Sequence, residues 1–394
     1  MTFAAPIPAP DMPADRAFQV TLLEDRDQLC AWADRWRSLE SVSVGSGGVF
    51  QSFDWLRPMM NLTDRQPCVV ALEDARGPAV IAPFSLVSWG GLQVLEWLGE
   101  PMLAYGDLLA RADVDVIESL GRGLAFLQQK GRRLDALHLR KVREDAAIAP
   151  FLRKMGAPCG SSRSPHADLR EFPNFEAFLA SRNKRSMKGY RRRSRRLAEE
   201  GKLHFRVHRA GPEAQTLARK GLDLKLEWMR AQGRVSRTFS SAARLEALIA
   251  GVGEQATGAC VSGLFLNERP LAIEIGYIQN SHYYSFMGAM DLDYSANSPG
   301  NLQIMETMRW CFNQGITVFD FLPPESDYKR SWATGDLGLS DYCFAFTPLG
   351  RLYSDLYVKS LHPLLLRAQA GAPSFVRGLS NLWLSRKGGK MEDA

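Results

Sequence analysis

The sequence predicts an α/β protein built from two similar domains, each a mixed and mostly antiparallel sheet flanked by helices. Two observations support this fold class. An order of strand, two helices, three strands, helix and strand can be read twice along the 394 residues. A stretch rich in Gly, Ser and Pro separates the two copies and has the composition of a linker. Each copy spans about 150 residues, a common domain size.

The first copy begins with an alternating apolar pattern at Phe18–Leu23, which predicts a strand. Apolar residues at helical spacing indicate one helix through Leu29, Trp32 and Trp36 and a second over Phe50–Met60. The remaining predicted elements are strands at Cys68–Glu73, Val80–Trp89 and Leu92–Gly99, a helix at Asp115–Gly131 and a strand at Leu134–Leu139.

The second copy repeats this order with little shared sequence. Its predicted elements are a strand at Leu203–Ala210, helices at Ala214–Gly233 and Ala242–Gln255, strands at Ala259–Asn267, Pro270–Gln279 and His282–Met290, a helix at Pro299–Gln314 and a strand at Thr317–Leu322. The predicted organisation is therefore a disordered leader (1–16), a first domain (17–158), a linker (159–173), a second domain (174–349) and a helical C-terminal tail (350–394).

The composition is that of an ordinary globular protein, with 45% hydrophobic and 23% charged residues. A net charge of +6 suits phosphorylated or acidic partners without requiring them. The six cysteines are scattered and form no CxxC pair. This spacing argues against a disulfide framework or a zinc cluster and favours a reducing, cytoplasmic compartment.

The two ends of the chain bear on its location. The first 16 residues are rich in Ala and Pro and lack the basic start and apolar stretch of a signal peptide. No apolar run approaches the roughly 20 residues that span a bilayer. The C-terminal tail mixes Leu and Trp with basic residues, which allows peripheral contact with the inner face of a membrane. A packing helix followed by a frayed end is the simpler explanation of the tail.

The turn Ser298-Pro299-Gly300 leads directly into a predicted helix. Proline is favoured at the first helical position, and a serine before it can cap the helix with its side chain. Glycine inside the cap costs helix stability, but it lets a ligand approach the free N–H groups. Because a helix N-terminus carries partial positive charge, the turn is predicted either to bind a pyrophosphate or to be a simple cap.

The most basic stretch of the chain, residues 181–202, is predicted to be a helix with cations on all faces. A solvated surface is one interpretation. Binding of a nucleotide, a lipid headgroup or a cyclic dinucleotide is a second, since Arg191 with Arg195 and Arg192 with Arg196 form i,i+4 pairs that can bind anions bidentately. Binding of tRNA is a third, although Tyr190 is the only nearby aromatic residue, which argues against base-specific reading of nucleic acid.

Several motifs carry a resemblance to a known family: VFQSFDWL, APFSL, LEWLG, RRRSRRL, PLAIEIG, YSANSPGNLQIMETM and GITVFDFLPPESDYKRSWA. Together they resemble the CelD/BcsL-type acetyltransferases, a group with tandem GNAT domains associated with cellulose and other exopolysaccharide synthesis. That group is similar to the FemAB-type aminoacyl transferases. The resemblance covers roughly Phe18 to Tyr357. It departs where Leu322-Pro323-Pro324 replaces a frequent Gly, and where LAYGDLL replaces a frequent Ser-Asp-Tyr pattern.

The resemblance implies two tandem GNAT-like domains and the transfer of an acetyl or other short acyl group from acetyl-CoA to a sugar-like amine or hydroxyl. The first domain lacks an SPG-like turn and is expected to shape the acceptor cleft. The second is expected to hold the cofactor, with the helix N-terminus at the pyrophosphate and the preceding strand along the pantetheine arm. The residues expected at the cofactor are Phe286, Met287, Gly288, Ser298, Pro299, Gly300 and Asn301.

Direct attack on the thioester is favoured, because the chain has no GxSxG motif and its histidines are scattered. Glu274 and Asp320 lie within apolar strands and are the candidate bases, since a desolvated carboxylate has a raised pKa. The alternative for both is a structural carboxylate. Backbone N–H groups of Phe286 to Gly288 are the candidate oxyanion donors, and Tyr328 is a candidate proton donor to the leaving thiolate.

Lys329 is a candidate ligand for an acceptor phosphate, and Lys225 and Trp228, one helical turn apart, are candidates to line the acceptor cleft. A surface helix with an aromatic anchor, and a core tryptophan, are the structural alternatives. Two other functions stay open: a FemAB-like aminoacyl transferase fed by tRNA, and a regulator that senses a cyclic dinucleotide on a decayed donor site.

Overall fold

The computed structural model describes residues 18–62, 64–234, 236–361 and 364. Among these, the residues up to Ser161 and from Gly338 onward form one compact unit, and Ser162–Leu337 forms another. The predicted leader and most of the predicted C-terminal tail lie outside the described residues. Within the described part, none of the helices combines the length and the apolar character that crossing a membrane requires.

The second unit contains a mixed sheet in the order β10-β11-β12-β13-β14-β9. Neighbouring strands are antiparallel except for β13 and β14, which are parallel. The strands are β9 (Gly160–Asp168), β10 (Leu203–His208), β11 (Ala259–Leu266), β12 (Arg269–Gln279), β13 (His282–Met290) and β14 (Val318–Asp320). Apart from β9, each was predicted, because strictly alternating or wholly apolar runs are typical of half-buried and buried strands.

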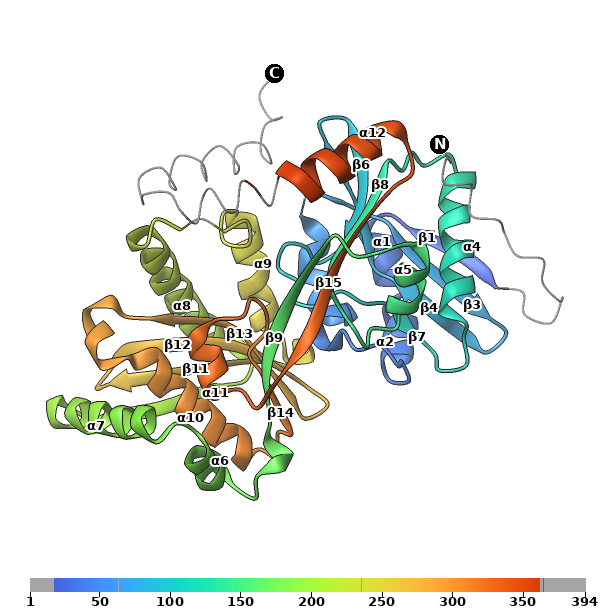
Figure 1. The fold of residues 1–394 in the computed structure, drawn as a ribbon. Coiled ribbons are helices and arrows are strands. Elements are labelled where there is room, and N and C mark those ends of the chain that lie inside the picture. The colour runs from blue at the N-terminus through green and yellow to red at the C-terminus, as the bar shows by residue number, and fades with distance from the viewer. Residues whose placement is uncertain (1–17, 63, 235, 362–363, 365–394) are drawn as a thin grey trace. The chain divides into compact units, whose positions relative to one another are not determined.

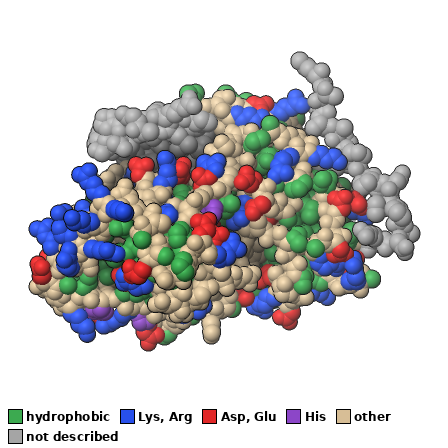
Figure 2. Space-filling model, turned by 60° about the horizontal axis from the view of Figure 1, so that its bottom comes forward, with side chains coloured by type: hydrophobic (Ala, Val, Ile, Leu, Met, Phe, Trp, Pro, Cys, Tyr) green, Lys and Arg blue, Asp and Glu red, His purple; other side chains and the backbone are tan. Residues whose placement is uncertain are grey.

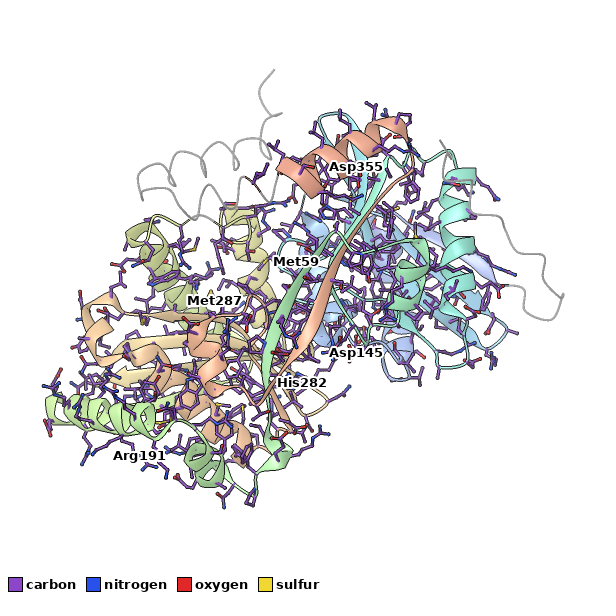
Figure 3. All side chains as sticks on the ribbon, in the orientation of Figure 1. Met59, Asp145, Arg191, His282, Met287 and Asp355 are labelled. Carbon is purple, nitrogen blue, oxygen red and sulfur yellow. The ribbon has the colours of Figure 1, made fainter. Side chains whose placement is uncertain are left out.

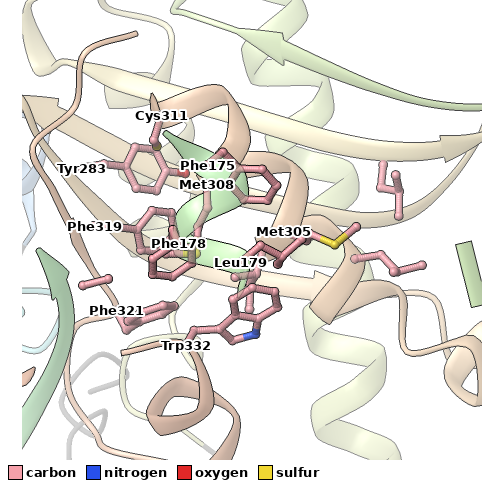
Figure 4. Packing of buried hydrophobic residues seen from close by; sticks show 14 of the residues in the cluster. Phe175, Phe178, Leu179, Tyr283, Met305, Met308, Cys311, Phe319, Phe321 and Trp332 are labelled. Carbon is pink, nitrogen blue, oxygen red and sulfur yellow. The ribbon is translucent and has the colours of Figure 1, made fainter. Parts of the chain in front are cut away.

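Helices cover both faces of this sheet (Figure 1). Helices α8 (Gly211–Ala231) and α9 (Ala242–Val252) pack on one face, and α6 (Phe175–Ser181), α7 (Lys184–Glu200) and α10 (Pro299–Asn313) on the other. The core beneath α10 is rich in aromatic rings, including Phe178, Tyr283 and Phe319 (Figure 4). The short helix α11 (Asp327–Trp332) adds the fully buried Trp332 to this core.

The first unit has two sets of strands, in the orders β1-β3-β4-β7 and β15-β8-β6-β5-β2. Its strands are β1 (Gln19–Leu23), β2 (Gln66–Pro67), β3 (Val69–Asp74), β4 (Gly77–Ala82), β5 (Phe84–Trp89), β6 (Leu92–Trp97), β7 (Leu109–Ala110), β8 (Ala136–Arg143) and β15 (Gly335–Ala345). Its helices are α1 (Arg26–Ala31), α2 (Ala33–Glu40), α3 (Phe53–Leu56), α4 (Val116–Gln129), α5 (Ala149–Met155) and α12 (Pro348–Arg351), which a π-helix continues over Leu352–Leu361.

Both units contain the same kind of connection, in which a helix links two parallel strands. In the first unit, the chain runs from β6 through α4 to β8, which lies parallel to β6. In the second, β13 leads through α10 to β14, which lies parallel to β13. All other pairs recorded between named strands of the described sheets are antiparallel. The predicted fold class, with mostly antiparallel mixed sheets flanked by helices, is therefore confirmed.

Three predicted boundaries are wrong. Residues 159–173 are not a linker, since most of them form β9 and a 3-10 helix at Leu169–Glu171. Residues 338–349, predicted in the second domain, cluster with the first unit because most of β15 pairs with β8. The single strand predicted at Val80–Trp89 is divided at Pro83 into β4 and β5, which pair with β3 and β6 respectively.

A buried carboxylate organises the loops of the first unit. Asp107 is fully buried, and it accepts hydrogen bonds from the backbone N–H groups of Ser46, Leu108, Ala147 and Ile148 at 2.8–3.1 Å. The last two of these groups lie directly before α5. One side chain thus satisfies amides from three segments that are far apart in the sequence, and buried amides left without acceptors are costly.

Replacing Asp107 with alanine should lower the free energy of unfolding by at least about 3 kcal/mol, because several buried N–H groups lose their acceptor. The midpoint of urea denaturation measures this loss. Asp34→Ala is the matched control: the Asp34 carboxylate is fully exposed, and the ion pair recorded for it among the described residues is with Arg37, so its loss should cost less than about 1 kcal/mol. Equal midpoints for the two variants would contradict the assigned role of Asp107.

Candidate active site

The parallel pair β13–β14 separates after three residues. The two strands pair only from His282 with Val318 to Tyr284 with Asp320. Beyond Tyr284, β13 continues to Met290 in register with β12, and this register shifts by one residue at Phe286. A bulge of this kind bends a strand and redirects its backbone groups. The edge of β13 that faces away from β12 is therefore outside the β13–β14 ladder after Tyr284.

Two glycines border open space, Gly288 on β13 and Gly300 at the start of α10. Gly288 is exposed, and no described atom lies within 4 Å of the position that a Cβ would occupy there. At Gly300, the only described atom within that distance is Met290 Sδ, at 3.7 Å. Figure 3 labels His282, where β13 begins, and Met287, the residue before Gly288. Side chains of the described residues therefore do not cover the backbone at these two positions.

The turn before α10 differs from the predicted cap. Ser298 has a left-handed backbone (φ 51°, ψ 52°), and its side chain makes no capping hydrogen bond. The prediction that the Ser298 hydroxyl caps α10 is therefore wrong, since side-chain caps use an extended backbone at that position. The Ser298 carbonyl instead accepts from the N–H groups of Asn301 and Leu302, and Pro299 occupies the first helical position as predicted.

The Asn301 side chain is held by an aromatic pair. Its Oδ1 accepts from Trp332 Nε1 at 3.1 Å, and the Trp332 ring stacks on Tyr190 with centroids 5.7 Å apart. These contacts join the start of α10 to α11 and α7. Asn301 was predicted to contact the cofactor, and the structure engages its amide oxygen with Trp332.

Glu274 lies on β12 and is only 2% exposed. Its Oε1 accepts from the Tyr283 hydroxyl at 2.5 Å and its Oε2 from the Ser285 hydroxyl at 2.9 Å. Burial raises the pKa of Glu274, while the two hydroxyl groups and the charge of Lys329 lower it. A carboxylate that is desolvated but held by donors has the character of a general base.

Lys329 and Tyr328 of α11 lie near this carboxylate. The Lys329 ammonium donates to the carbonyl groups of Leu322 and Pro324 at 2.7 and 3.0 Å. Burial lowers the pKa of Lys329 to about 8, with smaller opposing contributions from Asp320 and Glu274. Burial raises the pKa of Tyr328 to about 12, and the Glu274 charge adds to this shift, although 48% of the residue is exposed.

Lys225 reaches the same region from α8. Its ammonium donates to the Gly288 carbonyl at 3.2 Å and lies 4.8 Å from the centre of the Trp228 ring. Arg234 contacts the same ring at 5.2 Å. Trp228 is half-buried beside two cations. Burial lowers the pKa of Lys225, whose charge is also felt at Lys329, so the two ammonium groups belong to one cluster.

Asp320, the other candidate base, is fully buried at the end of β14. Its Oδ1 accepts from the Leu322 N–H at 2.8 Å, and its Oδ2 lies 3.4 Å from His282 Nε2. Leu322 has a left-handed backbone (φ 58°), which is strained for a bulky residue. Asp320 therefore stabilises the unusual turn whose carbonyl binds Lys329.

Helix α7 has one buried face, contrary to the prediction of cations all round. Met187 and Leu197 are buried, and Tyr190 packs on Trp332. Arg191 and Arg195 are both exposed, and Arg191 points away from the sheet in Figure 3. The structure does not place either arginine in the Glu274–Lys329 cluster.

Residues 184–330 match the family model described as an acetyltransferase (GNAT) domain. A structure of FemX aligns with 83% of this chain and 98% of its own length, with a TM-score of 0.58 and 14% identity. The structure of L-PGS from Bacillus licheniformis covers 83% of this chain and 95% of its own (TM-score 0.51, 14% identity). The C-terminal domain of a putative lysylphosphatidylglycerol synthetase from Agrobacterium fabrum covers 84% and 97% (TM-score 0.52, 12% identity).

The chain has a GNAT-like fold. No curated protein matches the sequence at a significant level, so the narrower resemblance to the CelD/BcsL-type group stays a prediction. The matched GNAT domain runs from α7 into α11 and includes Glu274, Lys225, Tyr328 and Lys329.

The two GNAT-like units differ at the equivalent helix. The N-terminus of α4 is capped by Asp115, whose carboxylate accepts from the N–H groups of Ile117 and Glu118 at 2.9 and 3.1 Å. A carboxylate already occupies the position where an anion would bind. That the donor site belongs to the second unit stays a prediction.

Sequence reasoning missed Tyr283 and Ser285, the two hydroxyl donors to Glu274. Both lie on β13 two residues apart, so they share one face of the strand. The β12–β13 register places them opposite Ile278 and Gly276, on the same face as Glu274. The sequence does show two hydroxyl residues spaced two apart in a strand that follows a short turn. This spacing indicates contact with Glu274 only if the β12–β13 register is already known.

The ammonium of Lys329 should titrate near pH 8, because burial disfavours its charged form. Pulsed amine acylation at a series of pH values, followed by mass spectrometry of the peptide, should give a labelling midpoint near that pH in the folded protein. The same lysine in urea is the control, with its ordinary pKa of about 10.5. Coincident midpoints in both states would contradict a desolvated Lys329.

Proposed function

We propose that this chain is an acyltransferase that moves an acetyl or other short acyl group from coenzyme A to an amine or hydroxyl of a sugar or polysaccharide precursor. The expected setting is exopolysaccharide or cell-envelope synthesis on the cytoplasmic side of the membrane. The observation that carries the proposal is the open space beside Gly288 of β13 and beside Gly300 at the start of α10, with Glu274 opposite Gly288 in the β12–β13 register. The match of residues 184–330 to a GNAT acetyltransferase domain supports the same chemistry.

In this proposal the start of α10 holds the diphosphate of coenzyme A. The 15-residue helix directs its positive end and the Gly300 N–H toward the turn. The backbone from Phe286 to Gly288 binds the pantetheine arm, because this part of β13 lies beyond its pairing with β14. The thioester is thereby placed near the Lys225 ammonium, which contacts the Gly288 carbonyl.

The acceptor nitrogen or oxygen attacks the thioester carbonyl, and the carbon–sulfur bond then breaks. Glu274 is buried, so it receives the acceptor proton through the Ser285 hydroxyl, which is half-buried and donates to Glu274 Oε2. Lys329 and the N–H groups of β13 stabilise the oxyanion. The Tyr328 hydroxyl is protonated before the reaction because its pKa is about 12, and it gives its proton to the leaving sulfur. Glu274 then releases the acceptor proton to solvent and Tyr328 regains one from solvent, so the protons balance.

Two neighbouring ammonium groups, Lys225 and Lys329, favour an acceptor that carries negative charge. A sugar linked to a nucleotide or lipid phosphate has that charge. Trp228, half-buried beside Lys225, offers an apolar ring to the same acceptor.

A second candidate is aminoacyl transfer from charged tRNA. The GNAT-like fold is shared with FemX and with a putative lysylphosphatidylglycerol synthetase. The CelD/BcsL-type group, which the sequence resembles, is itself similar to the FemAB-type aminoacyl transferases. A non-catalytic protein that binds a cyclic dinucleotide is the third. Titration calorimetry with coenzyme A, aminoacyl-tRNA and a cyclic dinucleotide separates the three, since each function requires a different ligand.

Substituting Gly300 with phenylalanine should weaken coenzyme A binding at least about tenfold, because the ring would occupy the space next to the Gly300 N–H. The fold should tolerate this change, since only Met290 Sδ lies near the Cβ position. Calorimetry measures the binding, and Gly300→Ala is the matched control that should bind within a few-fold of the native chain. Unchanged binding by Gly300→Phe would overturn the donor site.

Glu274→Gln should retain coenzyme A binding but slow acyl transfer by roughly 10²- to 10⁴-fold, the usual contribution of a general base. Release of the coenzyme A thiol in the presence of amino sugars and nucleotide sugars measures the rate. Glu268→Gln is the control, because Glu268 lies at the β11–β12 turn with 84% of its side chain exposed. Equal rates for the two variants would exclude Glu274 as the base.

A further inference from the structure

Helix α7 has a feature that the proposed reaction does not use. Its buried side carries Met187 and Leu197, and it packs on α6, α10, β10 and β11. Seven cations on its opposite side are all exposed. Figure 2 shows Lys and Arg side chains gathered on the part of the molecule where α7 lies.

These cations form two rows along the helix. At 100° per residue, the first basic row (Lys184, Lys188, Arg191 and Arg195) and the second basic row (Arg185, Arg192 and Arg196) lie roughly 90° apart. Together they extend about 18 Å along the axis, at 1.5 Å per residue. The rows end before Glu199 and Glu200.

The cations have few partners in the protein. Among the described residues, the one ion pair recorded for the two basic rows joins Arg191 to Glu176 at 3.7 Å, and both side chains are more than 60% exposed. Like charges at i,i+4 spacing repel one another and destabilise an isolated helix. An external polyanion would relieve this repulsion, whereas a purely solvated face would leave it in place.

We propose that the two basic rows of α7 dock the chain on the surface of a bilayer that contains anionic phospholipids. Arg and Lys side chains are long enough to extend from both rows to one plane, because each row lies about 45° from the line that bisects them. Clusters of four to eight basic residues on a helix bind anionic headgroups, and each additional cation near the surface strengthens the binding.

The shape of the patch favours a bilayer over RNA. Helix α7 lies flat against its unit and presents one broad face (Figure 1). That face carries no aromatic side chain for stacking on bases, since Tyr190 is stacked on Trp332. It also carries no large apolar side chain for insertion into lipid, so the contact is electrostatic and must weaken as salt is added.

Membrane docking would bring a lipid-linked acceptor within reach of the chain, and this extension alone rests on the proposed function. Vesicle binding does not depend on acyl transfer. Binding of vesicles without binding of coenzyme A would support the docking surface and contradict the transferase. Binding of coenzyme A without binding of vesicles would support the transferase and contradict the docking surface.

The test is flotation of the full chain with vesicles of phosphatidylcholine alone or of phosphatidylcholine mixed with phosphatidylglycerol, whose anionic headgroups give the surface a negative potential. The native chain should float with the anionic vesicles at low salt and should not float with the neutral vesicles. High salt should release it from the anionic vesicles. Arg192→Glu with Arg196→Glu should weaken anionic binding at least tenfold. Circular dichroism checks that each variant remains folded.

The matched control is Arg209→Glu with Lys220→Glu, which changes the net charge by the same amount at exposed positions outside α7. Its binding should stay within about twofold of native, since only charges near the surface contribute. Failure of the native chain to bind, equal binding to neutral vesicles, or equal binding by the two double variants would overturn the proposal. Preferential binding of duplex RNA at a salt concentration that releases the vesicles would overturn it in favour of a nucleic-acid surface.

Discussion

The short pairing of β13 with β14 is the constraint on which the candidate site depends. A ladder that continued to Met290 would satisfy the outer edge of β13 with β14 and leave no room for a ligand. The chain prevents this at Leu322-Pro323-Pro324, because proline cannot donate to a ladder and Leu322 has a left-handed backbone. The residues that depart from the resembled family's pattern thus lie where β14 has to end.

The same turn distinguishes the two candidate carboxylates. Asp320 accepts from the Leu322 N–H, and the Leu322 carbonyl then accepts from Lys329. One oxygen of this fully buried carboxylate thus holds the turn that positions Lys329, and the other lies 3.4 Å from His282 Nε2. The hydrogen bonds recorded for Glu274 come from two side-chain hydroxyl groups, one of them on the half-buried Ser285. The proposed mechanism therefore uses Glu274 as the base and Asp320 as the residue that maintains the turn.

Much of the second unit was predictable because its sheet and helices bury regular apolar faces, which appear in the sequence as periodicity. The predictions that were wrong concern features that depend on contacts between residues far apart in the sequence. Strand β9 has a linker-like composition and becomes a strand because β14 pairs with its Asp168 end. The left-handed Ser298 depends on the preceding 3-10 helix at Leu292–Asn297, and the contribution of Ser285 depends on the β12–β13 register. Local pattern identified Glu274 and Lys329, but their hydrogen-bond partners required the folded chain.

The comparison of α4 with α10 indicates how a duplicated fold can keep a single anion site. Both helices follow the first strand of a parallel pair, so both direct a positive end to equivalent places. In the first unit, Asp115 neutralises that end with a carboxylate that already accepts two N–H groups. In the second, the residue before the helix contributes only its carbonyl to α10, and a glycine replaces any side chain that would cover the Gly300 N–H. Under the proposed function, a negatively charged ligand would be repelled at α4 and attracted at α10, and one capping residue in each unit would account for that difference.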